Sequence, residues 1–175
     1  MYRERMETLK EWKVSKNRKP LIIRGARQVG KTWLMKEFGK LYYEKCAYIN
    51  FDNNSRMDIL FNEEFDLNRI IQGLKIESGI NIEPENTLII FDEIQETPNA
   101  LKALKYFYEN ANEYHIVAAG SLLGVAMHQG TSFPVGKVNF MDLMPLSFFE
   151  FLDALGQDHL LNLLKNIEFD MISVF

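Results

Sequence analysis

The chain has 175 residues, 47% of them hydrophobic, so it is long and apolar enough to bury one sizeable core. Its formal net charge of −4 excludes a protein that holds nucleic acid through overall positive charge. The single cysteine, Cys46, excludes an intramolecular disulfide, and no apolar stretch is long enough to cross a membrane. Residues 1–7 lack the apolar core of a secretion signal, so we expect a cytoplasmic protein.

The amino-terminal segment is basic: residues 1–20 contain seven Lys and Arg side chains against three Glu. DNA, RNA or an acidic partner could recognise such a segment. Apolar side chains also recur there at helical spacing, which predicts a solvated amphipathic helix over residues 1–12 that packs on the domain. We favour the helix as the explanation of the charge and expect weak or no binding to DNA.

A phosphate-binding pattern, G-x-x-x-x-G-K-[ST], follows an apolar strand predicted over residues 21–24. Its members are Gly25, Ala26, Arg27, Gln28, Val29, Gly30, Lys31 and Thr32. A helix is predicted over residues 31–44, so the pattern lies between a strand and a helix, as a phosphate loop requires. The apolar side chains on the buried side of this helix are predicted to be Leu34, Met35, Phe38 and Leu41.

This loop predicts a nucleotide site. Backbone N–H groups of a glycine-rich loop and the positive end of the following helix form a cradle for phosphates. We expect Lys31 to reach the β- and γ-phosphates and the Thr32 hydroxyl to bind Mg²⁺. No base-reading motif of GTPases is present, so ATP is the expected nucleotide.

Strands and helices alternate along the rest of the chain. Strands are predicted over residues 47–51, 87–91, 115–119 and, weakly, 137–141. Helices are predicted around residues 59–61, with a cap at Asn54 or Ser55, over 66–76, from Pro98, over 148–155 and from His159. This alternation predicts an α/β fold with a mostly parallel sheet covered on both faces.

Two acids, Asp92 and Glu93, follow the apolar strand over residues 87–91. Ligands of open α/β sheets bind at the carboxyl ends of the strands. Asp92 is therefore expected to hold Mg²⁺, directly or through water, and Glu93 to orient or deprotonate the water that attacks the γ-phosphorus. The alternative, a solvated turn, does not explain four large apolar residues before the pair.

Four further side chains keep two interpretations each. Ser121 ends a strand and either reaches the γ-phosphate or the attacking water, or is a small turn residue. Gln95 either senses the nucleotide or contacts Ser121, or is a surface residue. Arg24 and Arg27 either reach phosphate, a neighbouring subunit or an acidic loop, or are solvated, which we favour. No arginine finger is evident between Ser121 and Met144.

The chain resembles the AAA-type branch of P-loop ATPases, in a prokaryotic group of ATP-binding proteins. The resemblance rests on residues 22–32 (IIRGARQVGKT), 91–95 (FDEIQ), 119–124 (AGSLLG), 134–137 (PVGK) and 145–152 (PLSFFEFL). It implies a three-layer P-loop NTPase fold with a five-stranded sheet of order 5-1-4-3-2. By position it implies that Lys31 and Thr32 bind phosphate and Mg²⁺, Asp92 binds Mg²⁺, Glu93 is the catalytic carboxylate and Ser121 is the polar sensor.

The resemblance also implies a domain plan. Residues 1–155 are expected to form the AAA-type ATPase domain, with residues 1–18 as its N-terminal helix. Residues 156–175 are expected to begin a helical C-terminal region that this chain does not complete. The expected partners are the nucleotide, that C-terminal domain, other copies of the chain and, as an open question, nucleic acid.

Three functions compete. The first is a Mg²⁺-dependent ATPase that drives a conformational change in the attached domain. The second is a slowly hydrolysing switch, used in signalling or defence, whose output is nucleotide binding. The third, a kinase that phosphorylates a small molecule, is disfavoured because Glu93 suits the activation of water.

Overall fold

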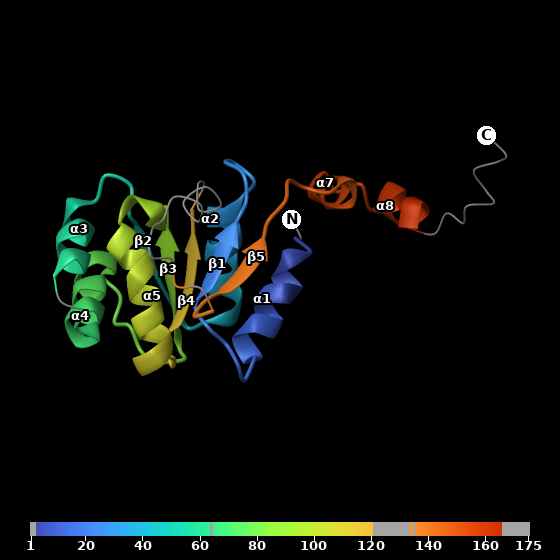
Figure 1. Ribbon diagram of the computed structural model, residues 1–175. Coiled ribbons are helices and arrows are strands. Elements are labelled where there is room, and N and C mark those ends of the chain that lie inside the picture. Colours follow the sequence, from blue (N-terminus) through green and yellow to red (C-terminus); the bar gives the residue numbers. More distant parts are fainter. Residues whose placement is uncertain (1–2, 64, 121–133, 135, 166–175) are drawn as a thin grey trace.

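A computed structural model describes residues 3–63, 65–120, 134 and 136–165, and the elements alternate as predicted (Figure 1). The strands are β1 (Leu21–Arg24), β2 (Lys45–Asn50), β3 (Thr87–Asp92), β4 (His115–Ala119) and β5 (Asn139–Asp142). The helices are α1 (Arg5–Val14), α2 (Lys31–Tyr42), α3 (Ser55–Asn62), α4 (Leu67–Ser78), η1 (Ile94–Glu96), α5 (Pro98–Asn110), α7 (Phe148–Ala154) and α8 (Asp158–Lys165).

The five strands form one parallel sheet of order β2-β3-β4-β1-β5. This is the order 5-1-4-3-2 counted from the opposite edge, so the expected topology is confirmed. Because β4 lies between β1 and β3, its pairing with each neighbour determines which residues of β1 and β3 lie at the same height in the sheet. Ala119 of β4 pairs with Ile23 on one side and with Asp92 on the other.

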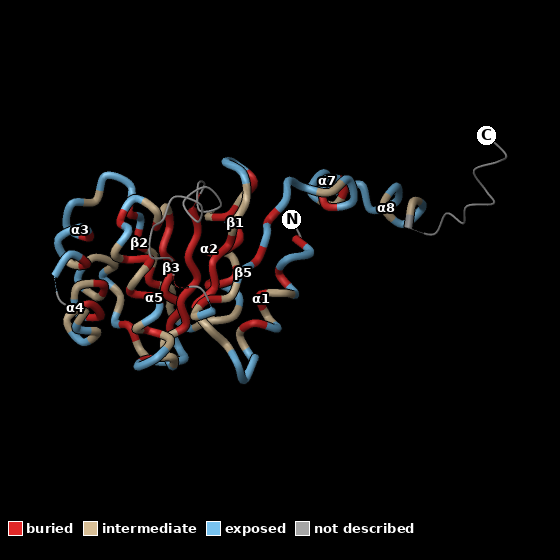
Figure 2. The backbone as a smooth tube through the Cα atoms, in the orientation of Figure 1, coloured by how far each residue is buried: buried red, intermediate tan, exposed pale blue. Residues whose placement is uncertain are grey.

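Alternate strand residues point to opposite faces of the sheet and produce two core layers. Leu21 and Ile23 belong to a buried cluster that includes side chains of α1 and α2, whereas Ile22 belongs to a cluster with α3, α4 and α5. Figure 2 shows that burial is concentrated in the strands between these helical layers. The result is the predicted three-layer α/β fold.

The basic N-terminal segment contains the predicted helix, α1. Its buried side chains are Met6, Leu9 and Trp12, and the Trp12 indole donates to the Lys19 carbonyl at 2.8 Å. The prediction that this helix packs on the domain is confirmed.

The structure corrects several boundaries. Helix α2 ends at Tyr42 because Tyr43 is extended, with φ −130° and ψ 155°. Leu41, predicted to be buried, is 55% exposed. The rings of Tyr42 and Tyr43 pack on Phe38 in its place, at centroid distances of 5.3 and 5.6 Å. Strand β2 begins at Lys45, two residues early, and β5 covers Asn139–Asp142, later than predicted.

His115 begins β4 as a buried residue beneath α1. Its Nδ1 lies 2.6 Å from the Tyr43 hydroxyl, and its ring makes edge contacts with Tyr43 and Trp12. Burial, together with the positive charges of Arg18 and Lys13, lowers the pKa of His115 from 6.5 to about 4.

This pKa makes stability depend on pH. The unfolded imidazole takes up a proton near pH 6.5, whereas the folded one stays neutral down to about pH 4. The unfolded state therefore binds more protons in this window, and the free energy of unfolding falls as the pH is lowered through it. When the pH is lowered from 6.5 to about 4, urea unfolding is expected to show a smaller loss of unfolding free energy for His115→Gln than for the wild type. His159→Gln, on exposed α8, is the matched control, and equal profiles for all three proteins would contradict the assignment.

Candidate nucleotide site

A pocket of about 580 Å³ opens at the carboxyl ends of β1, β2 and β3. This is the edge of an open α/β sheet at which ligands bind, and the volume suits a nucleotide-sized molecule. The lining residues come from the phosphate loop, the start of α2 and the segments after β2 and β3. They are Arg27, Gln28, Gly30, Lys31, Thr32, Trp33, Asp52, Glu93, Gln95 and Glu96.

The phosphate loop is held in a conformation that depends on two glycines. Gly30, which caps the N-terminus of α2, has φ 91°, a region that side chains rarely adopt. Gly25 has φ 156°, and a Cβ atom there would lie 2.3 Å from the Leu143 carbonyl oxygen. The loop therefore lies directly against the backbone that follows β5, and a larger residue at position 25 would move it.

Lys31 is folded back into the loop. Its side chain is buried, and Nζ donates to the carbonyls of Gly25 at 2.9 Å and Ala26 at 2.7 Å. Burial lowers the pKa of this ammonium group, while the negative charges of Glu93 and Asp92 oppose the shift. A cation that has exchanged water for two neutral carbonyls favours an anion at this position.

The Thr32 hydroxyl and the Asp92 carboxylate meet across the sheet. Thr32 Oγ1 donates to Asp92 Oδ2 at 2.7 Å, and the Tyr48 hydroxyl donates to the same oxygen at 2.9 Å. Burial and the adjacent Asp92 charge raise the pKa of Tyr48, so its hydroxyl remains a donor. Among the described residues, none donates a hydrogen bond to Asp92 Oδ1, although this oxygen is buried.

The environment of Asp92 Oδ1 indicates whether Mg²⁺ fits this site. A buried carboxylate oxygen without a donor is costly unless a cation or water binds it. Mg²⁺ is usually held by one or two protein oxygens together with phosphates and waters, and Thr32 and Asp92 are such a pair. The described residues contain no cluster of three or more His, Cys, Asp or Glu side chains suited to a metal. The donor set therefore fits Mg²⁺ shared with a ligand.

Glu93 has a left-handed backbone with φ 52°, which costs a non-glycine residue on the order of 1 kcal/mol. Gln95 Nε2 donates to Glu93 Oε2 at 2.7 Å and to Glu96 Oε1 at 3.2 Å. Gln95 Oε1 is buried and has no hydrogen-bond partner among the described residues. Gln95 is thus a half-buried contact of Glu93 that lines the pocket. Its expected contact with Ser121 involves a residue outside those that the structure describes.

The other candidate residues, Arg24, Arg27 and Ser121, differ in where they lie relative to the pocket. Arg24 makes a bidentate ion pair with Asp142, with both N···O distances at 2.9 Å. This acid lies on strand β5, so Arg24 is neither simply solvated, as we favoured, nor bound to an acidic loop. Arg27 is exposed and lines the pocket. Ser121 lies outside the described residues.

Sequence reasoning missed Tyr48 and Asp52. Tyr48 lies on β2, two residues before the carboxyl end of the strand, and Asp52, two residues beyond that end, lines the pocket. The position of β2 beside β3 is the signal that could have found them, since the ends of parallel neighbours share one edge.

The comparisons with known proteins identify the family and the fold. A family model described as an AAA domain matches residues 17–152. The chain belongs to this AAA family. Its described helices include none long and apolar enough to cross a membrane. No curated protein matches the AAA chain.

Three solved structures share the fold of this AAA domain. A Walker-type ATPase of Pyrococcus abyssi has TM-score 0.58 and 16% identity, over 88% of this chain and 57% of that one. The Drosophila origin recognition complex bound to DNA has TM-score 0.57 and 18% identity, over 87% and 45%. Aeropyrum pernix ORC1 in complex with DNA has TM-score 0.51 and 14% identity, over 90% and 50%. The chain thus spans about half the length of these structures.

Proposed function

We propose that this AAA domain binds ATP with Mg²⁺ in the pocket, hydrolyses it and passes the nucleotide state to a C-terminal domain. The observation that carries the proposal is the contact between Thr32 and Asp92 at 2.7 Å, beside the buried, unbonded Asp92 Oδ1. One residue from the phosphate loop and one from β3 thus supply a hydroxyl and a carboxylate at a single point. Family membership and the fold support a nucleotide ligand.

Each chain residue has a distinct role in this proposal. Lys31 exchanges the carbonyls of Gly25 and Ala26 for phosphate oxygens, and the loop N–H groups donate to the same phosphates. Mg²⁺, when bound, neutralises charge on the phosphate oxygens. Glu93, the carboxylate next to Asp92, orients or deprotonates the attacking water. It must release the Gln95 amide before both of its oxygens are available.

A slowly hydrolysing switch is the second candidate, and the contact between Glu93 and Gln95 favours it. A carboxylate that is bonded to an amide and held in a left-handed backbone is not free to position water. If this contact persists when nucleotide is bound, the protein would signal through nucleotide binding itself, and ATP hydrolysis would be slow.

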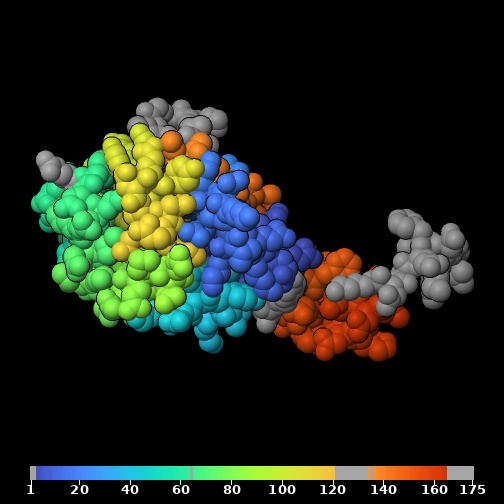
Figure 3. All heavy atoms as spheres, turned by 90° about the horizontal axis from the view of Figure 1, so that it is seen from below, coloured from blue at the N-terminus to red at the C-terminus, as the bar shows by residue number. Residues whose placement is uncertain are grey.

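The coupling part of the proposal rests on α7 and α8. These helices protrude from the body beside the N-terminal segment (Figure 3). Apolar side chains of these helices and of the residue that caps α7 are largely exposed, including Phe148 at 61%, Leu155 at 57% and Leu163 at 52%. We propose that residues 1–155 form the ATPase domain, that residues 156–175 begin the C-terminal region, and that this region covers the apolar surface.

Nucleic acid is a weaker candidate partner. Two similar structures were solved with DNA, but the basic side chains of the N-terminal segment are mostly engaged within the protein. Lys10 pairs with Glu7 at 2.7 Å, and Lys19 donates to the Gly136 carbonyl at 2.6 Å. Lys13 and Arg18 also donate to backbone carbonyls.

Lys31→Ala tests the ligand. Hydrogen bonds to charged groups contribute about 1.5–3 kcal/mol, so the variant is expected to bind Mg·ATP at least about tenfold more weakly by calorimetry. Lys40→Ala, at an exposed position on the same helix, is the control and should bind as the wild type does. Both variants should remain folded, since the hydrogen bonds that Lys31 makes with the described residues go to two loop carbonyls and not to the core. Equal affinity in Lys31→Ala would refute the loop as the phosphate site.

Glu93→Gln separates hydrolysis from switching. An ATPase should lose phosphate release by about 10²–10⁴-fold while retaining nucleotide, because general-base catalysis contributes an effect of that size. Glu113→Gln, in the turn before β4, is the control and should keep the wild-type rate. A wild type that holds ADP tightly without turnover under any condition would favour the switch.

A further inference from the structure

Arg3 and Glu150 form a buried ion pair between the N-terminal segment and helix α7. Arg3 is 4% exposed and Glu150 is 7% exposed, and Arg3 Nε lies 3.1 Å from Glu150 Oε1. Removing two charges from water costs as much as their attraction returns, so such a pair is a poor source of stability. Its position in the fold therefore requires another explanation.

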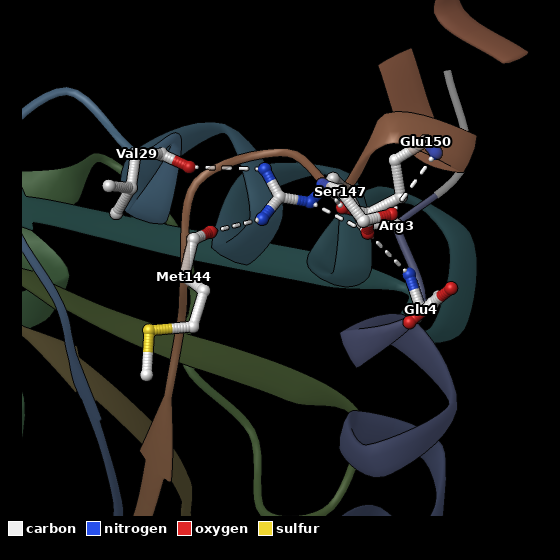
Figure 4. A network of polar contacts seen from close by, with 6 residues as sticks. All are labelled: Arg3, Glu4, Val29, Met144, Ser147 and Glu150. Atoms are coloured by element: carbon white, nitrogen blue, oxygen red, sulfur yellow. Dashed lines mark hydrogen bonds and ion pairs between the residues drawn. The ribbon is translucent and has the colours of Figure 1, made fainter. Parts of the chain in front are cut away.

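The Arg3 guanidinium also holds two segments of backbone (Figure 4). Nη1 donates to the Val29 carbonyl at 3.1 Å, and Nη2 donates to the Met144 carbonyl at 2.8 Å. Val29 belongs to the phosphate loop, whereas Met144 lies in the connection between β5 and α7. One side chain thus joins the loop, this connection and the carboxylate of α7.

The contact with Val29 bears on the shape of the cradle. In a trans peptide the C=O and the next N–H point in opposite directions. The bond from Arg3 to the Val29 carbonyl therefore directs the Gly30 N–H away from Arg3, and Gly30 lines the pocket. Gly30 has φ 91° and, as a glycine, tolerates several backbone orientations, so the contact from Arg3 helps to select one.

Glu150 connects the same arginine to α7. Its Oε2 accepts the Ser147 N–H at 2.9 Å, and its own N–H donates to Ser147 Oγ at 3.2 Å, which closes a capping box at the start of the helix. Its Oε1 accepts the Glu4 N–H at 2.9 Å. The carboxylate that begins α7 is therefore bonded to the N-terminal segment, which in turn holds the phosphate loop.

We propose that Arg3 is a positioning residue of the nucleotide site, which couples the conformation of the phosphate loop to the attachment of α7 through its pair with Glu150. The inference rests on the proposed nucleotide binding. It identifies the path along which nucleotide state reaches α7 and α8: from the Val29 peptide to Arg3, then to Glu150 and the capping box. Coupling is reciprocal. Bound nucleotide should therefore strengthen the attachment of α7 to the domain, and weakening that attachment should lower the affinity for nucleotide.

The test compares three variants of the 175-residue chain with the wild type. Arg3→Met removes both backbone contacts. Glu150→Gln removes the charge but keeps an acceptor for the capping box. Asp142→Asn breaks the more exposed Arg24–Asp142 pair at the same edge of the sheet and is the matched control. Affinity for Mg·ADP is measured by calorimetry, stability by urea unfolding, and α7 protection by hydrogen exchange with and without Mg·ADP.

Arg3→Met and Glu150→Gln are expected to bind Mg·ADP about tenfold more weakly, an ordinary coupling strength, whereas Asp142→Asn stays within about twofold. Mg·ADP should slow amide exchange in α7 of the wild type and of Asp142→Asn but not in Arg3→Met. A residue with only a structural role would not remove this nucleotide-dependent protection.

Arg3→Met leaves a buried carboxylate without its cation and could lower stability by itself. The double variant Arg3→Met/Glu150→Gln removes both charges and should recover wild-type stability. It is still expected to bind weakly, because nothing holds the Val29 carbonyl. Wild-type affinity in this variant, or unchanged α7 protection in Arg3→Met, overturns the inference while leaving the proposed function intact. A wild type that binds no nucleotide overturns the proposed function, and the inference with it.

Discussion

The 2.7 Å contact between Thr32 Oγ1 and Asp92 Oδ2 is the interaction on which the site depends. It exists because Ala119 of β4 pairs with Ile23 of β1 and Asp92 of β3, so that these strands end at one level. Strands two positions apart in a sheet are about 10 Å apart, and the side chains of Thr32 and Asp92 bridge the strand between them. The short phosphate loop achieves this, which explains why its glycines and its contact with the backbone after β5 matter.

In the described conformation most of the polar side chains of the site are hydrogen-bonded to other groups of the protein, whereas Asp92 Oδ1 is not. Lys31 donates to loop carbonyls, Thr32 and Tyr48 donate to Asp92, and Gln95 donates to Glu93. Under the proposed function, a phosphate, a divalent ion or a water replaces each of these contacts. Nucleotide binding would then exchange one set of hydrogen bonds for another and release the side chains that the proposed chemistry needs.

Much of this arrangement could be predicted from the sequence. The apolar strands, the glycine-rich loop and the Asp92–Glu93 pair are local patterns, and the strand order followed from the family resemblance. The contacts of Arg3 could not be predicted, because nothing in the sequence separates it from the other basic residues near the N-terminus. The contact between Gln95 and Glu93 depends on a left-handed backbone at Glu93, which periodicity does not encode. Tyr48 could have been found by following the expected pairing of β2 with β3 to the carboxyl ends of both strands.

A crystal structure with a non-hydrolysable ATP analogue and Mn²⁺ in place of Mg²⁺ would reveal whether Thr32 and Asp92 share a divalent ion. We expect one anomalous Mn²⁺ peak beside Thr32 Oγ1 and Asp92 Oδ1, with Lys31 Nζ turned from the Gly25 and Ala26 carbonyls to the phosphates. A nucleotide bound elsewhere, or a Mn²⁺ peak remote from both oxygens, would contradict this expectation.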